Sequence, residues 1–453
     1  MPGRGRGGIP TVQGSWLLGS ARRLQRDQLG TYEDALRSYG NIARFRVGPP
    51  RLGFEFDAVF HPDGARDVLT SRSCIKNAPP LMTEFSRLFG DNLISLDGEG
   101  WQSHRRIVQP LLTRQRIVDY LPVIARASGD LVDSWETAAR AGRSVDLAEE
   151  AMRYALSALG RTLFGGDLQD AAPMLRSEAP ALLAHAARRG LSPVRTPASW
   201  PTPANRRAER GRRSVYGFVD ELIRRRRSEG GDGLLTLLLN AMDPKTGNQL
   251  RDDEIRDEAL VFFLAGYETT ASALAFTLHL LSQHPEAQER VREEAQRSLG
   301  GREAGVTDLD TLPYTAQVID EALRLFPTVP TLVRRTADHV EVLGHTIPPG
   351  TTLAVSVWTI HRNPAIWPEP ERFDPDRFAP ERRGDQDRYA HLPFGSGPRT
   401  CVGLHLALAE LVMVVAAIVQ AYSLRSLDQT PALEHDLTLR PRGALRCELE
   451  PVA

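Results

Sequence analysis

The chain has 453 residues, 41% hydrophobic and 25% charged, which are ordinary proportions for a globular enzyme. Its formal net charge of −1 gives no overall electrostatic reason to expect binding to nucleic acid or to an anionic membrane. Three cysteines, Cys74, Cys401 and Cys447, are too few for an all-cysteine zinc site, and their odd number argues against a disulfide framework. This cysteine content favours a reducing compartment, and we expect the cytoplasm.

No membrane anchor is expected from the hydrophobic pattern. Residues 1–10 are rich in glycine and arginine and lack the apolar centre of a signal peptide. The longest uninterrupted apolar run, 411–419, is far shorter than the ~18 residues that span a bilayer, so it is predicted to be a buried helix. No linker divides the chain, and we therefore expect a single domain over residues 1–453.

The N-terminal part predicts a small β-region among helices. Residues 31–38 predict a short helix, and the apolar runs 42–47 and 54–60 predict a β-hairpin. Pro62 suits the first turn of a helix that extends to Thr70. Residues 71–100 lack a regular pattern, and we predict a long loop of the kind that often carries function.

Trp101 and Arg105 are the first pair of interest in chain order. They lie four residues apart in a helical stretch, and therefore on one face of the helix. Taken alone, such a pair is most often an aromatic–cation contact on a solvated surface.

The middle of the chain predicts three helices. Residues 146–164 form one, and residues 173–227 form two more, joined by the proline-rich turn 192–203. Arginine runs at 206–213 and 224–227 are interpreted as solvated helix faces, because acidic residues interrupt them. We therefore expect no nucleic-acid partner.

A long helix follows, with Asp252 and Asp253 as N-cap candidates and roughly thirty residues before the next proline. Its segment 265–270 reads Ala-Gly-Tyr-Glu-Thr-Thr. A mid-helix glycine costs about 1 kcal/mol, and such a local cost in a core helix suggests function. The alternative is that Gly266 allows close packing and that the Thr269 hydroxyl bonds to the preceding turn; both interpretations can hold together.

The downstream part holds a second charged pair on a helix. Residues 314–325 predict a helix that carries Glu321 and Arg324 three positions apart, which alone indicates a surface pair worth about 0.2–0.5 kcal/mol. An extended run, 328–333, leads into two adjacent arginines.

The segment 394–403 is rich in glycine and proline and delivers Cys401 to the start of an apolar helix, 404–422. The positive end of a helix dipole favours the thiolate form of a cysteine in this position. The alternative, of about equal weight on these grounds alone, is a buried cysteine that acts as a small hydrophobe.

The residues around this cysteine carry a resemblance to a known family. Phe394, Gly397, Arg399, Cys401 and Gly403 form Phe-x-x-Gly-x-Arg-x-Cys-x-Gly, which resembles the haem-binding loop of the cytochrome P450 superfamily. The resemblance implies that Cys401 is the axial thiolate ligand of a haem b iron. It also implies that Phe394 packs beside the sulfur and that Arg399 pairs with a haem propionate, with Gly403 part of the cofactor-binding loop. A thiolate ligand favours O–O cleavage at the iron.

Two further motifs support the resemblance. Trp101 and Arg105 are similar to a Trp-x-x-x-Arg helix whose side chains reach a haem propionate. The segment 265–270 resembles the (Ala/Gly)-Gly-x-(Asp/Glu)-Thr-(Thr/Ser) signature, where the family's helix opens locally beside the iron. This implies that Ala265 lies against the macrocycle, while Glu268 and Thr269 deliver the protons needed to split dioxygen.

The resemblance also implies roles for several charged residues. Glu321 and Arg324 are expected to be buried with Arg377 as a structural clamp for the chain that leads to the cysteine loop. Of the adjacent arginines, Arg334 rather than Arg335 is expected to bind a haem propionate, although spacing alone leaves the choice open.

The fold class implied is mainly α with a smaller β-rich region, the cytochrome P450 fold, and a monomer. The implied function is a monooxygenase that inserts one oxygen atom from O2 into a C–H bond of an apolar small molecule, terpenoid- or polyketide-like. Alternatives are a peroxygenase driven by H2O2 and a non-catalytic haem-thiolate protein that binds a ligand or gas; the Glu268–Thr269 pair argues against both.

Electrons are expected from NAD(P)H only indirectly, because no flavin or nicotinamide fingerprint is present. A ferredoxin and its reductase are the expected partners. Arg106, Arg114 and Arg116 could contact such an acidic partner, and ordinary surface arginines are the alternative.

The predicted substrate pocket is apolar, which favours terpenoid, polyketide or fatty-acid-like ligands over charged ones. Its candidate residues are Leu81, Met82, Phe85, Leu88, Leu183, Phe262, Val329 and Leu332.

Overall fold

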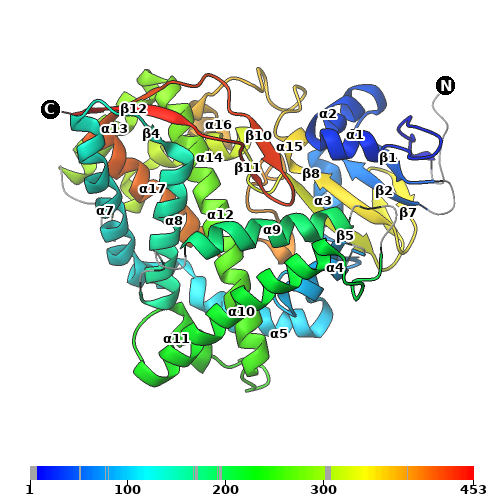
Figure 1. Ribbon diagram of the computed structural model, residues 1–453. Helices are drawn as coiled ribbons and strands as arrows, with labels where there is room; N and C mark the ends of the chain where they lie inside the picture. Colours follow the sequence, from blue (N-terminus) through cyan, green and yellow to red (C-terminus); the bar gives the residue numbers. More distant parts are fainter. Residues whose placement is uncertain are drawn as a thin grey trace.

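Helices make up most of the computed structural model, and the largest sheet lies at one side with the first helices of the chain (Figure 1). This confirms the predicted fold class, mainly α with a smaller β-rich region. The structure describes residues 8–49, 53–76, 78–79, 81–166, 168, 172–190, 192, 196–300, 308–384 and 386–452.

The largest sheet has five strands in the order β1-β2-β8-β5-β3. The first two strands pair antiparallel, as predicted for a hairpin, with Ile42 opposite Val59. The third pairs parallel to β2, so this sheet joins the N-terminal residues to the second half of the chain. In sheet order the strands are β1 (Ile42–Val47), β2 (Phe54–Val59), β8 (Thr352–Ser356), β5 (Thr331–Thr336) and β3 (Cys74–Ile75).

The helices around this sheet confirm two predictions and correct one. Helix α2 (Gln28–Tyr39) includes the predicted 31–38, and α3 (Pro62–Thr70) has the predicted bounds, with Pro62 in its first turn. The prediction of a long loop over 71–100 is wrong, because α4 (Leu81–Phe89) lies inside it and α5 (Gly98–Val108) begins before its end. The buried residues of α4 recur at helical spacing. The prolines at 79 and 80, directly before the helix, suggested a loop instead.

The remaining elements include the helices predicted over 146–164, 173–227, 314–325 and 404–422, with ends within a few residues of the predicted ones. The helices are α1 (Ala21–Arg26), α6 (Arg114–Ile117), α7 (Leu121–Arg140), α8 (Leu147–Phe164), α9 (Ala172–Gly190), α10 (Pro203–Glu229), α11 (Leu234–Asn240), α12 (Asp252–Gln283), α13 (Pro285–Leu299), α14 (Pro313–Leu325), α15 (Val357–Ile360), α16 (Pro380–Arg383) and α17 (Leu404–Ala421). The strands are β4 (Val145–Asp146), β6 (Val340–Val342), β7 (His345–Ile347), β9 (Tyr422–Ser426), β10 (Leu433–His435), β11 (Leu439–Pro441) and β12 (Arg446–Pro451).

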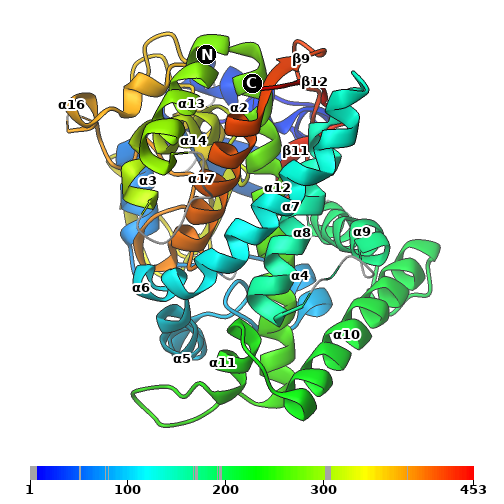
Figure 2. The ribbon, with the colours of Figure 1, turned by 90° about the vertical axis from the view of Figure 1, so that its left-hand side faces the viewer.

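Helix α12 runs for 32 residues through the centre of the molecule, with α8 and α17 packed against it (Figure 2). Its N-cap is Arg251, not Asp252 or Asp253, because the Glu254 side chain accepts a hydrogen bond from the Arg251 backbone N–H, 2.8 Å away. The two aspartates lie in the first turn, where their negative charges interact favourably with the positive end of the helix dipole. The helix is continuous, so the local opening that the resemblance implies is not seen.

In the part of the chain that the structure describes, two helices, α12 and α17, are long and apolar enough to cross a bilayer by length and composition. Their most apolar windows are 78% and 61% buried inside the protein. The buried part of α17 includes most of 411–419, which confirms the prediction of a buried helix there. Both are therefore explained as core helices.

Candidate active site

The cysteine loop takes its shape from glycines. Gly395 and Gly397 have φ values of 68° and 74°, in the left-handed region that glycine tolerates best. A Cβ atom at Gly397 would lie 2.2 Å from the carbonyl oxygen of Leu69 at the end of α3, so no other side chain fits there. The backbone N–H of Cys401 donates to the Phe394 carbonyl at 3.0 Å and closes the loop.

Cys401 stands just before α17, as predicted. Its side chain is exposed, yet burial raises the pKa of its thiol. The sulfur is therefore accessible to a ligand although much of the surrounding space is filled by protein. The backbone N–H groups of Gly403 and Leu404 and the Arg105 guanidinium act in the opposite direction on that pKa and favour the thiolate.

One face of the otherwise buried α12 is open to solvent. Ala265 is exposed, and Phe262 and Thr269 are half-buried; they recur every three or four residues and so share a face. The Thr269 hydroxyl donates to the Ala265 carbonyl at 2.5 Å, which is the hydrogen bond expected from the alternative interpretation. Gly266 also has a packing role, because a Cβ there would lie 2.7 Å from Leu159 of α8.

Glu268 points away from that open face and is only 3% exposed. Its Oε1 atom accepts a hydrogen bond from Nη1 of Arg440, in β11, at 3.1 Å. Burial raises the pKa of the Glu268 carboxyl, and Arg440 opposes this shift. Arg440 lies 172 residues away and belongs to no motif, so nothing in the sequence indicated its contact with Glu268.

The predicted propionate-binding residues gather beside the cysteine loop. Arg105 donates from Nη1 to the Thr400 carbonyl at 2.8 Å, and Arg399 stacks over the Trp101 ring with its Cζ 4.1 Å from the ring centroid. Arg399 also forms an ion pair with Asp97, just before α5.

Arg334 and Lys76 complete this group of cations. Arg334 is 3% exposed, and the charges beside it include Asp97; Arg335 instead reaches the Gly350 carbonyl at 3.5 Å. Burial, together with repulsion from Arg334 and Arg399, lowers the pKa of Lys76 to about 7. Nothing in the sequence marked Lys76. We refer to Lys76, Arg105, Arg334 and Arg399 as the cation cluster.

The predicted clamp residues also lie together. Glu321 and Arg324 are fully buried, and their two carboxylate–guanidinium hydrogen bonds measure 2.6 and 2.8 Å. Arg377 approaches Glu321 at 3.4 Å. Arg324 also donates to the carbonyl oxygens of His361 and Pro370, which lie on the chain leading to the cysteine loop.

The predicted pocket residues divide into two groups. Leu81, Phe262, Val329 and Leu332 keep some exposed surface, and a Cβ on Gly395 would lie 3.6 Å from Leu332. The others are buried, and Leu88 offers no surface to a ligand at all; they are Met82, Phe85, Leu88 and Leu183.

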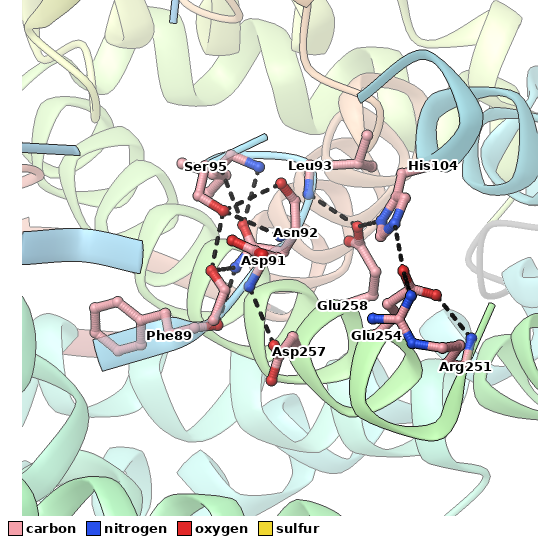
Figure 3. A network of polar contacts seen from close by, with 12 residues as sticks. Phe89, Asp91, Asn92, Leu93, Ser95, His104, Arg251, Glu254, Asp257 and Glu258 are labelled. Carbon is pink, nitrogen blue, oxygen red and sulfur yellow. Dashed lines mark hydrogen bonds and ion pairs between the residues drawn. The ribbon is translucent and has the colours of Figure 1, made fainter. Parts of the chain in front are cut away.

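A polar network that the sequence did not reveal fixes the segment after α4 against α12 (Figure 3). The backbone N–H groups of Asp91 and Leu93 donate to Asp257 and Glu258, at 3.1 and 2.8 Å. His104 of α5 lies 2.6 Å from the same Glu258 oxygen. Because Arg399 contacts the Leu93 carbonyl, this network holds one wall of the cation cluster.

Residues 9–447 match the family model described as Cytochrome P450, which covers nearly the whole chain. The chain belongs to the cytochrome P450 family. Cytochrome P450s bind haem, and this one is a monooxygenase of that family.

Similar proteins include two from Streptomyces melanosporofaciens. The cyclooctat-9-en-7-ol 5-monooxygenase is 34% identical over 96% of this chain and 93% of its own, and cyclooctatin synthase is 31% identical over 98% and 95%. Human cytochrome P450 4F3 is 31% identical over 97% of this chain and 89% of its own. Among solved structures, the crystal structure of the cytochrome P450DA heme domain superposes with a TM-score of 0.88 at 27% identity, and 98% of each chain is covered.

The residues of this P450 fit a haem. Lys76, Arg334 and Arg399 lie near the carboxylate of Asp97, and Arg105 lies near Arg399, so the cluster has an excess of positive charge that a dianionic macrocycle would largely offset. Beside them stand an accessible thiol at Cys401 and the small exposed side chain of Ala265. A flat, apolar group with two carboxylates has the chemistry that these side chains require.

Proposed function

We propose that this P450 hydroxylates an apolar terpenoid-class molecule, with Cys401 as the axial ligand of its haem and with electrons from a separate ferredoxin-type partner. The observation that carries the proposal is the exposed thiol of Cys401 beside the cation cluster. When bound, the haem supplies the activation of dioxygen. The protein supplies ligation, orientation and protons.

Haem anchoring is assigned to the cation cluster and to Trp101. Arg105, Arg334 and Arg399 bind the propionates, and Lys76 joins them as a fourth cation. A bound carboxylate would oppose the repulsion that lowers the pKa of Lys76 and would keep this lysine charged. Phe394 and Gly403 shape the loop around the sulfur, and Ala265 leaves room for the macrocycle.

Proton delivery is assigned to Glu268 and Thr269. In this assignment the buried Glu268 carboxyl takes up and passes on a proton, and Thr269 lies one residue further on, at the edge of the open face of α12. In the present arrangement the Thr269 hydroxyl proton is bonded to Ala265, so its oxygen is available as an acceptor. Glu321, Arg324 and Arg377 act structurally.

A terpenoid substrate is supported by the names of the two Streptomyces relatives and by the apolar side chains of α4, α9 and β5. An acidic electron donor is supported by Arg114 and Arg116, whose side chains are 71% and 53% exposed although each pairs with an exposed carboxylate, Asp310 and Asp119. Arg106 does not support it, because buried Asp243 binds its guanidinium at 2.6 and 2.7 Å.

The test combines ligation and turnover. The reduced, CO-treated protein should show the Soret shift of a thiolate-ligated haem, and Cys401→Ser should abolish that shift. Cys447→Ala, at a buried cysteine in β12, is the matched control and should keep it. If Cys401→Ser keeps the shift, the ligand assignment is wrong.

Substrate class is tested by titrating cyclic diterpene alcohols, fatty acids and macrolides into the ferric protein and following the change from low to high spin. Terpenoids should give the tightest binding and, with a ferredoxin, its reductase and NADPH, a hydroxylated product. Tighter binding and turnover of another class would refute the terpenoid assignment, and equal turnover with H2O2 alone would refute the need for a donor.

A further inference from the structure

The β10–β11 hairpin brings a cation to the buried acid of α12. Leu433 pairs with Pro441 and His435 with Leu439, and the hairpin is held against the core because the backbone N–H of Leu439 donates to the Thr328 carbonyl at 2.9 Å. Leu439 itself is fully buried, in a cluster that includes Phe276 of α12. A side chain on this hairpin therefore has a fixed position relative to α12.

Arg440 is that side chain, and it is shared among three carboxylates. Nη1 lies 3.1 Å from Glu268, and Nη2 lies 3.2 Å from Glu434 and 3.3 Å from Asp436. The Glu434 side chain is 49% exposed and that of Asp436 is 25% exposed, whereas that of Glu268 is 4% exposed. Arg440 thus connects the buried acid to carboxylates that meet solvent.

The two oxygens of Glu268 have different surroundings. Oε1 is bound by Arg440, and Oε2 is buried without a hydrogen-bond partner among the residues that the structure describes. The Thr438 hydroxyl, at the tip of the hairpin, makes no hydrogen bond of ordinary geometry within the described residues, yet it lies close enough to Glu268 to favour the carboxylate and lower its pKa. One oxygen is thereby fixed and the other is available to hold a proton.

We propose that Arg440 is a positioning residue that, from the hairpin, fixes the orientation of Glu268 and sets the pH at which Glu268 takes up its proton. This inference rests on the proposed relay role of Glu268. The charged groups with the largest effect on the Glu268 carboxyl are Arg440 and Asp436, and both come from this hairpin. His435 lies beside them, but burial lowers its pKa to about 4, so it is neutral near pH 7.

The experiment follows protonation directly, by infrared difference titration of the resting ferric holoprotein. The band to follow is the protonated-carboxyl band that disappears in Glu268→Gln. In Arg440→Gln its midpoint should move to higher pH by about one unit or more, because a nearby cation no longer favours the anion. In Asp436→Asn it should move to lower pH, because a competing anion is removed.

Three controls separate this effect from general damage. Arg440→Lys keeps the charge and should restore most of the wild-type midpoint. Arg446→Gln removes an arginine that pairs with Asp428 at 3.0 Å and should leave the midpoint unchanged. If Arg440→Gln fails to fold, the opposite shift in Asp436→Asn still tests the idea.

Turnover distinguishes the two levels of the proposal. The fraction of consumed electrons recovered in product should fall in Glu268→Gln, and its pH profile should shift in Arg440→Gln in the direction of the infrared midpoint. If Glu268→Gln couples electrons to product as well as wild type, the relay itself is refuted. If Glu268→Gln is impaired while Arg440→Gln and Asp436→Asn leave the infrared midpoint in place, only the role of Arg440 is refuted.

Discussion

Glu410 is a second buried acid next to the functional segment of α12. It lies on α17, is 4% exposed, and is hydrogen-bonded to Thr270. Residues 268 and 270 are about 200° apart around the helix, so Glu268 and Thr270 face opposite sides. Within the described part of the chain, one side of α12 therefore holds an acid paired with a cation, and the other side holds an acid with no paired cation.

The absence of a paired cation predicts a pH-dependent stability. Burial raises the pKa of Glu410 to about 8 from an ordinary 4.5, so the folded protein binds one more proton than the unfolded chain between these values. Stability should therefore fall as pH rises across that window, by about 1.4 kcal/mol per unit from this group. Glu410→Gln keeps a hydrogen-bonding side chain and should remove this part of the slope.

The measurement is urea unfolding of the wild type and Glu410→Gln at several pH values from 5 to 8. The variant should gain stability over wild type as pH rises. Glu136→Gln, at an exposed carboxylate of α7, is a control that should leave the slope unchanged. Parallel curves for wild type and Glu410→Gln would contradict a proton on Glu410.

The clamp residues Glu321, Arg324 and Arg377 form buried ion pairs that join α14 to the segment before the cysteine loop. Glu321→Gln should destabilise the protein by about 3–5 kcal/mol, because it leaves the fully buried Arg324 without its counter-ion. Denaturant unfolding of the holoprotein measures this loss. Asp34→Asn removes two exposed ion pairs, with Arg23 and Arg37, and should cost less than about 1 kcal/mol. Similar losses in the two variants would rule out a special role for the clamp.

An ion pair also joins α4 to α9. Arg189 donates two hydrogen bonds to Glu84, at 2.8 and 3.0 Å, and both side chains are largely buried. Both helices carry predicted pocket residues. Glu84→Gln should weaken their contact and increase the rates at which a ligand such as phenylimidazole enters and leaves the pocket, several-fold each.

Stopped-flow spectroscopy of the haem measures both rates. Glu209→Gln, on α10 in a looser surface pair with Arg212 at 3.7 Å, should change neither rate. Unchanged rates in Glu84→Gln would show that the pocket opens elsewhere.

The sequence predicted local helices and turns well, but it did not predict contacts between residues far apart in the chain. Helical periodicity and a proline in the first turn predicted α3 to the residue, and the glycine pattern predicted the φ > 0 turn before Cys401. These signals are local, since each depends on residues a few positions apart. Arg440 and Lys76 are held by residues far along the chain, and no local pattern carries that information.

At the scale of the whole molecule, the largest core cluster includes buried residues from Ala78 to Leu449. The long helices from the middle and the end of the chain share this core, so no single cut would divide it into two. We propose on this basis that residues 1–453 form one domain, as expected from the lack of a linker.

Cleavage of the chain tests this proposal. A protease site inserted between Ala198 and Ser199, in the connection from α9 to α10, should be cut while the two fragments stay together on native gel filtration and keep the haem. They should separate only in denaturant. Fragments that separate under native conditions would contradict a single domain.

The contact between Gly397 and the Leu69 carbonyl has a consequence for directed evolution of this enzyme. Because α3 ends against the loop, there is no space for an extra residue between Phe394 and Cys401. An insertion there, or a side chain at position 397, would displace the sulfur. In a library randomised at position 397 and screened for the colour of bound haem, glycine alone should be recovered at that position. The helices α4 and α9 carry five of the eight predicted pocket residues, so diversity aimed at new substrates is best placed there.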